Sequence, residues 1–194
     1  MNLNLKFKFN SYIMEAIYAV DSKNGLSKEG IIPWKSKKDM KFFMNKTINN
    51  VVIMGKKTYF SLSENHRPLK NRLNIVLTCA PELYMFENYQ SGSYTNKFEN
   101  VIFTANDKIH EVILNDREKY CRLYPSLSRE FKIFFIGGKT IYEQFIPLCD
   151  TVWITQIKCD YECDLFIDYD YSKEFKGAVL EEDDELIITE YKRV

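Results

Sequence analysis

Short, wholly apolar runs that end in glycine constrain the fold of this chain more than any other feature. Residues 51–54 read Val-Val-Ile-Met before Gly55, and residues 133–136 read Ile-Phe-Phe-Ile before Gly137 and Gly138. Runs of this length without alternating polar residues are typical of strands in a parallel sheet, which is buried on both faces. A helical pattern follows each run, so we expect an α/β domain with a mostly parallel, twisted sheet flanked by helices.

The same patterns predict the remaining elements. Strands are expected at residues 13–20, 73–78, 101–104, 152–157 and 186–192, the last of them antiparallel. A helix is expected over 106–120, with Ile109, Val112 and Ile113 on its inner face, and another over 139–145. Loops are expected at 21–34, 79–100 and 123–130, and the acidic run 181–185 is interpreted as a solvated turn.

Charge and cysteine usage narrow the classes of function. Lys plus Arg and Asp plus Glu both number 27, so a net charge near zero gives no reason to expect a nucleic-acid or membrane partner. The five cysteines form no CxxC pair, so we expect reduced thiols, no metal site and a cytoplasmic location. At 194 residues the chain suits one domain, expected over 13–194. Residues 1–12 lack the apolar core of a signal peptide and are expected to be a disordered extension or an extra edge strand.

One carboxylate stands out at residues 31–44, where every other charged residue is basic. Asp39 lies six residues after Pro33, which disfavours a helix at the residue before it. Three apolar residues then recur at spacings of three and four and predict a helix with one apolar face: Met40, Phe43 and Met44. The Asp39 carboxylate borders that face near the helix start. It could cap the helix or serve a ligand, and the residue pattern alone favours the cap.

Two strand-to-helix junctions could approach a ligand. After Gly55 come Lys56, Lys57 and Thr58, and cationic side chains at such a turn, together with its backbone N–H groups, favour a phosphate. Surface lysines at an ordinary turn would give the same pattern. Gly137 and Gly138 would let the backbone approach a ligand closely, and a plain tight turn is an equal alternative.

Five segments, in order, resemble the dihydrofolate reductase family, and its eukaryotic branch more than its bacterial one. They are residues 16–34 (AIYAVDSKNGLSKEGIIPW), 52–62 (VIMGKKTYFSL), 67–78 (RPLKNRLNIVLT), 135–145 (FIGGKTIYEQF), and 154–157 with 164–166 (ITQI and DLF). The resemblance implies the fold of that family and the reduction of 7,8-dihydrofolate to 5,6,7,8-tetrahydrofolate by NADPH, which supports one-carbon metabolism and thymidylate synthesis. It also implies a monomer, and the sequence contains no thymidylate synthase segment.

The resemblance assigns roles on the substrate side. Asp39 matches the acidic residue that binds the amino group and N3 of the pterin, with Thr155 hydrogen-bonded to it and Trp34 beside it. Ile17 and Ile136 match positions whose carbonyls face the junction of pterin and nicotinamide. The other substrate-binding positions are Phe43, Leu62 and Arg72, of which Arg72 matches the arginine that binds the α-carboxylate of the glutamate tail. A lone carboxylate in an apolar pocket should have a raised pKa.

The resemblance assigns a larger set of residues to NADPH. Ala19 and Leu26 match positions that hold the carboxamide, and Gly137-Gly138 matches a pair usually joined by a cis peptide. Cys79 stands where many relatives have a basic or hydroxyl residue near the 2′-phosphate, so NADPH preference should depend more on Lys56, Lys57 and Thr78. The implied cofactor positions are Ala19, Leu26, Gly55, Lys56, Lys57, Thr58, Leu77, Thr78, Gly137, Gly138, Lys139, Thr140, Ile141 and Tyr142.

Two alternatives remain for the function. One is an enzyme of the same fold that reduces another pteridine-like or pyrimidine-like ring. The other is a non-catalytic homologue that binds folate or RNA. Arg72 favours a substrate with a carboxylate tail, and the neutral net charge argues against RNA.

Overall fold

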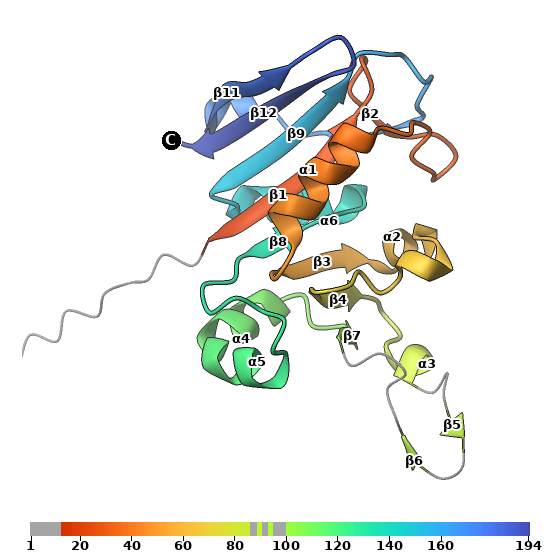
Figure 1. Cartoon of the computed structure of the whole chain (residues 1–194), viewed down its shortest axis with the longest axis vertical. Helices are drawn as coiled ribbons and strands as arrows, with labels where there is room; N and C mark the ends of the chain where they lie inside the picture. Colours follow the sequence, from red (N-terminus) through yellow and green to blue (C-terminus); the bar gives the residue numbers. More distant parts are fainter. Residues whose placement is uncertain (1–12, 86–88, 91–92, 95–99) are drawn as a thin grey trace, which may run out of the picture.

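The computed structural model describes residues 13–85, 89–90, 93–94 and 100–194. Within these residues, eight strands form one sheet in the order β11-β12-β9-β1-β8-β3-β4-β7 (Figure 1). Their bounds are β1 (Met14–Val20), β3 (Val51–Gly55), β4 (Leu73–Leu77), β7 (Val101–Thr104), β8 (Ile133–Phe135), β9 (Thr151–Ile157), β11 (Phe175–Glu182) and β12 (Leu186–Arg193). The strands from β9 to β7 pair in parallel, which confirms the predicted mostly parallel sheet. Residues 1–12, predicted as an extension, lie outside the described part of the chain.

The antiparallel end of the sheet is larger than the sequence predicted. β12 pairs antiparallel with β9, as expected, and β11 extends the sheet beyond β12. Strand β11 was not predicted, because only Phe175 is buried in it and its apolar residues 178–180 form a short, exposed run. Glu181 and Glu182 belong to β11, and the predicted acidic turn is confined to residues 183–185.

Helices cover both faces of the sheet. They are α1 (Lys37–Thr47), α2 (Lys56–Ser61), α3 (Glu82–Met85), α4 (Ile109–Asn115), α5 (Arg117–Leu123) and α6 (Lys139–Phe145), with the 3₁₀ helices η1 (Glu64–His66), η2 (Ile146–Leu148) and η3 (Tyr171–Lys173). Two small antiparallel pairs join β2 (Gly25–Ser27) to β10 (Leu165–Phe166) and β5 (Tyr89–Gln90) to β6 (Ser93–Tyr94). In the described residues no helix has the length and apolar character needed to cross a membrane.

The helix predicted over 106–120 is two helices. It breaks at Asp116, which ends α4 and begins α5. Asn115 and Asp116 are poor helix formers because their side chains compete for backbone hydrogen bonds. Ile109 and Ile113 face the core as predicted, whereas Val112 is exposed and the prediction for it was wrong.

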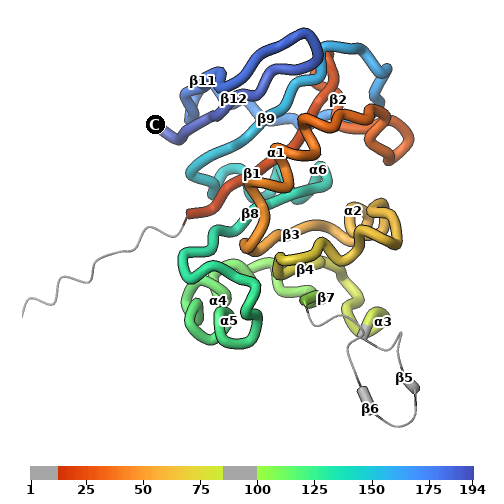
Figure 2. The backbone as a smooth tube through the Cα atoms, in the orientation of Figure 1, coloured from red at the N-terminus to blue at the C-terminus, as the bar shows by residue number. Residues whose placement is uncertain are grey.

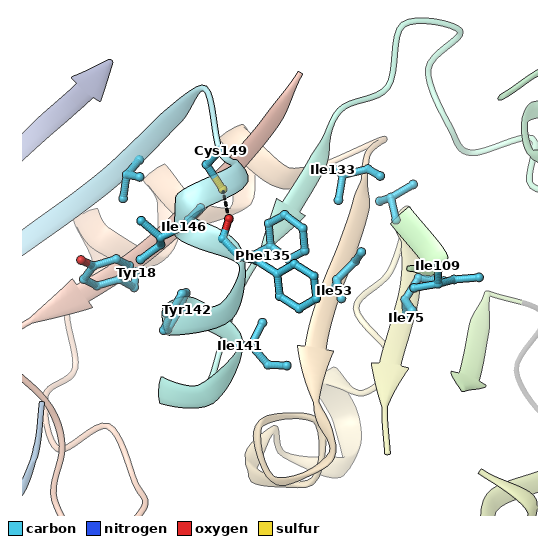
Figure 3. Close-up of a cluster of buried hydrophobic side chains, with 14 of the residues drawn as sticks. Tyr18, Ile53, Ile75, Ile109, Ile133, Phe135, Ile141, Tyr142, Ile146 and Cys149 are labelled. Atoms are coloured by element: carbon cyan, nitrogen blue, oxygen red, sulfur yellow. Dashed lines mark hydrogen bonds between the residues drawn. The ribbon is translucent and has the colours of Figure 1, made fainter. Parts of the chain in front are cut away.

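One core lies between the sheet and α4, α5 and α6. Figure 3 shows the side chains of this core, with Phe135 of β8 close to α6. The Phe135 ring stacks on Phe145 at 4.4 Å between centroids, and Cys149 donates a hydrogen bond to the Phe145 carbonyl at 3.3 Å. Tyr18 of β1 lies 4.8 Å from Tyr142 of α6. These contacts fix α6 against β1 and β8.

The second face of the sheet carries α1 and α2, and Figure 1 shows α1 in front of the sheet and α6 behind it. Phe42 of α1 lies 5.9 Å from Trp153 of β9, and Phe43 packs against the same cluster. The apolar face predicted for α1 was wrong in part, because Met40 and Met44 are 58% and 50% exposed. The two phenylalanines, one residue apart, meet the sheet instead.

The order of the strands brings distant parts of the sequence to one edge. Figure 2 shows β1, from the start of the chain, between β8 and β9 from its second half. β8 also pairs with β3, so the carboxyl ends of β1, β3 and β8 lie near one another. In parallel α/β sheets this edge is where ligands bind.

Candidate active site

The Asp39 carboxyl group is held toward the sheet at the first turn of α1. The cap of this helix is Ser36, whose hydroxyl accepts a hydrogen bond from the Asp39 backbone N–H at 3.2 Å. The capping interpretation of Asp39 was therefore wrong, and its carboxylate is available for another partner. That partner is Thr155 of β9, which is 1% exposed and hydrogen-bonds the carboxylate.

Burial of Asp39 has an electrostatic consequence. Desolvation raises the pKa of its carboxyl group, the Thr155 hydrogen bond opposes this, and the nearby negative charge of Glu185 adds to the increase. The raised pKa predicted from the sequence is confirmed in direction. An acid of this kind keeps its proton to a higher pH than an exposed aspartate does.

Trp34 precedes α1 and is buried at its start. It packs with Ile157 and Leu186 of the sheet, and its ring lies 5.6 Å from that of Tyr161. The extended segment after Pro33 thus enters the helix with a fixed direction. Ala19 of β1 is partly buried against the same cluster.

An apolar cluster lies beside the Asp39 end of α1. Ile17 at the centre of β1 and Ile136 just after β8 are buried in it, and Phe43 and Leu62 pack against it from α1 and from the end of α2. The Ile17 carbonyl accepts a hydrogen bond from the hydroxyl of Tyr142 at 3.1 Å. The structure therefore brings together four residues that the resemblance assigned to the substrate.

The glycines after β3 and β8 form a close contact. The Gly55 N–H donates to the Gly137 carbonyl at 2.7 Å, and the bond between Gly137 and Gly138 is cis, as the resemblance implied. Gly137 has φ +110°, and a Cβ there would lie 3.0 Å from the Tyr142 ring. A Cβ at Gly138 would lie 3.3 Å from the Thr58 hydroxyl. Larger residues at these positions would therefore fill the junction between α2 and α6.

Cationic and hydroxyl groups surround that junction. Lys56 and Lys57 are exposed in the first turn of α2, and neither α2 nor α6 is capped by a side chain in the described residues. Leu77 pairs with Gly55 on the adjacent strand. Thr78 follows, and its hydroxyl oxygen accepts a hydrogen bond from the Ala80 N–H at 3.4 Å.

Some of the residues that the resemblance assigned to the cofactor have side chains that are paired or buried away from this junction. Lys139 pairs with Glu143 one turn along α6, at 3.4 Å. Ile141 is buried beside Gly55, and Thr140 is exposed. Leu26 belongs to the core on the α6 face. The roles of these positions toward a cofactor are proposals.

Arg72 lies under the other end of α1. Its Nε donates to the Thr47 hydroxyl at 2.9 Å, and its two terminal nitrogens donate to the carbonyls of Lys70 and Met44 at 2.7 and 3.3 Å. Arg72 is 5% exposed. A guanidinium has five N–H groups, so three internal bonds orient the group and leave donors for a carboxylate. Asp39 and Thr47 are about 12 Å apart along the helix axis.

Sequence reasoning missed a buried carboxylate in the loop between β1 and α1. Asp21 accepts hydrogen bonds from the N–H groups of Lys23 and Gly25 at 2.9 and 2.8 Å, and from Tyr161 at 3.2 Å. It therefore joins the 21–34 loop to the loop after β9. An Asp followed by glycine four residues later signals such a turn, but not its distant partner.

Comparisons with known proteins agree with this geometry. A family model described as dihydrofolate reductase matches residues 13–115 and 96–189. The bifunctional dihydrofolate reductase-thymidylate synthase of Daucus carota is 37% identical over 79% of this chain, which spans only 28% of that relative. The dihydrofolate reductase of Aedes albopictus is 30% identical over 77% of this chain and 76% of its own length.

A solved structure extends the comparison to the fold. The dihydrofolate reductase from Enterococcus faecalis complexed with NADP(H) and RAB-propyl has a TM-score of 0.61 and 26% identity, covering 93% of this chain and 96% of that one. The family model matches more than half of the chain, and the solved structure covers nearly all of it. This chain belongs to the dihydrofolate reductase family.

Proposed function

We propose that this protein reduces 7,8-dihydrofolate to 5,6,7,8-tetrahydrofolate with NADPH. The observation that carries the proposal is the Asp39 carboxyl group, which is partly buried at the start of α1 and hydrogen-bonded to Thr155. A pterin ring offers an amino group and a ring nitrogen that such a carboxyl group can bind side by side. The apolar cluster with Ile17 and Phe43 would cover the ring faces.

The two ends of α1 suit the two ends of the substrate. Asp39 would bind the pterin at the start of the helix, and Arg72, fixed by Thr47 and the Met44 carbonyl, would bind the glutamate tail near its end. The exposed side chains of Met40 and Met44 lie between these ends on α1. They would be covered by the central ring of a bound dihydrofolate.

The residues at the junction of α2 and α6 fit a dinucleotide. The close approach of Gly55 to Gly137 and the absence of a Cβ at Gly138 leave backbone surface where a larger residue would stand. Lys56 and Lys57 supply positive charge, and Thr58 and Thr78 supply hydroxyl groups. When bound, NADPH would supply the hydride that the protein itself cannot provide.

The protein's own part in the reaction is to orient the pterin and exclude water. Asp39 would hold the ring so that its reacting carbon faces the cofactor, and a water molecule would carry the proton to N5. Because burial raises the pKa of Asp39, the protonated form extends toward neutral pH. Turnover should therefore fall as pH rises through that pKa.

The test is the loss of reduced-nicotinamide absorbance when the protein is mixed with NADPH and a substrate. Dihydrofolate should support rapid oxidation of NADPH, and a dihydropterin that lacks the benzoylglutamate should support it with a much higher KM. A pyrimidine-like substrate that outperformed dihydrofolate would favour a different reductase of the same fold. Absence of oxidation with all three would overturn the proposal.

We also propose a monomer that works in a reducing, cytoplasm-like compartment without nucleic acid. The five cysteines are all free thiols, and Cys149 is buried. Burial raises the pKa of the Cys149 thiol well above its usual value, which keeps it unreactive. Light scattering at assay concentrations should give the mass of one chain, and a dimer mass would contradict this.

A further inference from the structure

Four aromatic rings form a cluster beside α2. Tyr84 of α3 stacks on Phe103 of β7, with centroids 4.8 Å apart and planes 17° apart. Phe60 of α2 lies 5.4 Å from Tyr84, and Tyr59 meets both Phe60 and Phe103 edge to face. The ring of Tyr84 is thus held on two sides, by α2 and by β7.

Lys56 lies over the same ring. Its ammonium nitrogen is 5.9 Å from the centroid of Tyr84, within the range of a cation–π contact. Lys56 is the first residue of α2, directly after Gly55. A lysine side chain has much rotamer entropy to lose, so a contact that restricts it before a ligand arrives lowers the cost of binding.

The loop after β4 brings Tyr84 to this place. The Thr78 N–H donates to the Thr104 carbonyl at 3.0 Å, so the loop starts against the end of β7. The Ala80 N–H then binds the Thr78 hydroxyl, and the Tyr84 N–H binds the Pro81 carbonyl at 3.0 Å. Cys79, which offers no positive charge, lies within this turn.

We propose that Tyr84 is a positioning residue for Lys56. Its ring holds the Lys56 ammonium group at the place where that group binds the 2′-phosphate of NADPH. The inference rests on the proposed function, since it assumes that the junction of α2 and α6 binds this cofactor. Part of the preference for NADPH over NADH would then depend on an aromatic residue that carries no charge. Lys56 provides the charge, and Tyr84 provides its position.

The experiment uses fragments of the cofactor, so that binding is measured without catalysis. Adenosine 2′,5′-bisphosphate carries the 2′-phosphate and adenosine 5′-monophosphate lacks it. Calorimetry on the full chain should show that Tyr84→Leu weakens the bisphosphate by about two- to five-fold, the worth of an exposed cation–π contact. The monophosphate should bind almost unchanged.

Three further variants make the test specific. Tyr84→Phe keeps the ring and should bind both nucleotides as the parent does. Leu83→Ala changes an exposed neighbour on α3 and controls for disturbance of that helix. Tyr84→Leu added to Lys56→Gln should cause no further loss of bisphosphate binding, because the two residues act as one unit.

Each contrary result has a distinct meaning. Equal weakening of both nucleotides by Tyr84→Leu, or an undiminished effect in the Lys56→Gln background, would overturn the role of Tyr84 while leaving the reductase proposal intact. Equal loss in Tyr84→Phe would assign the effect to the hydroxyl and would also overturn it. A parent protein that does not prefer the bisphosphate would refute the inference together with the proposed cofactor.

Discussion

At the scale of single residues, the proposed chemistry depends on the position of one partly buried carboxyl group, that of Asp39. Ser36 caps α1 and so releases the Asp39 side chain from that task. Thr155 then holds the carboxyl group against β9, and desolvation raises its pKa. Such an arrangement favours function over stability, because an ionised carboxylate in an apolar place is costly to the folded state.

Asp39→Asn should therefore stabilise the ligand-free protein at neutral pH. The folded state has the higher Asp39 pKa, so it binds more protons than the unfolded chain, and stability falls as pH rises from the ordinary value of 3.8 through the raised one. Asparagine does not ionise and escapes this loss, while its amide oxygen can still accept from Thr155. Thermal melts should show a higher midpoint for the variant near neutral pH and a shrinking difference as pH falls. A lower midpoint at every pH would contradict the cost assigned to Asp39.

Arg72→Leu tests the other end of the substrate. The charge-assisted contact is worth about 1.5–3 kcal/mol, so the KM for dihydrofolate should rise at least ~10-fold while kcat changes little. A dihydropterin without the glutamate should keep its parental KM. Loss of affinity for both compounds would show that Arg72 acts through its bonds to Thr47 and Met44 on α1, and not through the tail.

At the scale of elements, one buried side chain helps to hold the loop between β1 and α1, together with the pairing of β2 with β10. Asp21 uses one carboxylate oxygen for Lys23 and Gly25 and the other for Tyr161. Gly25 is needed beside it, because a Cβ there would lie 2.2 Å from the Cβ of Cys163. The loop that carries Leu26 and leads to Trp34 is therefore tied to the loop after β9.

Asp21→Asn should keep the hydrogen bonds within the loop and break the one to Tyr161 in the loop after β9. The amide oxygen can still accept from Lys23 and Gly25, whereas the amide N–H₂ would face the Tyr161 N–H, donor against donor. We expect a loss of about 1–3 kcal/mol in the free energy of unfolding and a change in the fluorescence of Trp34, which packs on Tyr161. Lys23→Gln, which removes the exposed pair between Lys23 and Asp160, is the matched control and should change neither. Equal effects of both substitutions would argue against a special role for Asp21.

The elements that can be predicted from the sequence are those that are buried and therefore consist mainly of apolar residues. Strands β3, β4 and β8 are apolar, apart from the buried Asn74, because both faces are covered, and α6 has the predicted bounds. The break at Asp116 has a local cause in the weak helix propensity of Asn115 and Asp116, which the apolar spacing of Ile109 and Ile113 outweighed in the prediction. Strand β11 depends on pairing with β12, which no local pattern contains. The same holds for the site: Asp39 and the glycines could be found from the chain, whereas Asp21 and Tyr84 act through partners far along it.

At the scale of the whole molecule, the sheet brings the residues proposed to bind the substrate close to those proposed to bind the cofactor. β1 lies between β8 and β9, so the Asp39–Thr155 pair on one face is close to the glycine junction after β3 and β8. The core between the sheet and α6 holds Tyr142, whose hydroxyl fixes the Ile17 carbonyl between these two regions. We propose that hydride transfer to dihydrofolate occurs where these two regions meet, with Asp39 orienting the pterin.

The most direct test is the rate of NADPH oxidation by dihydrofolate, measured across pH for the parent and for Asp39→Asn. The parent rate should fall as pH rises through the raised pKa of Asp39. The variant should lose at least ~10²-fold in turnover near neutral pH, the scale of a lost acid or electrostatic group, and its profile should lack that descent. A variant within a few-fold of the parent, or one that keeps the same pH profile, would contradict the assignment of the reaction to Asp39.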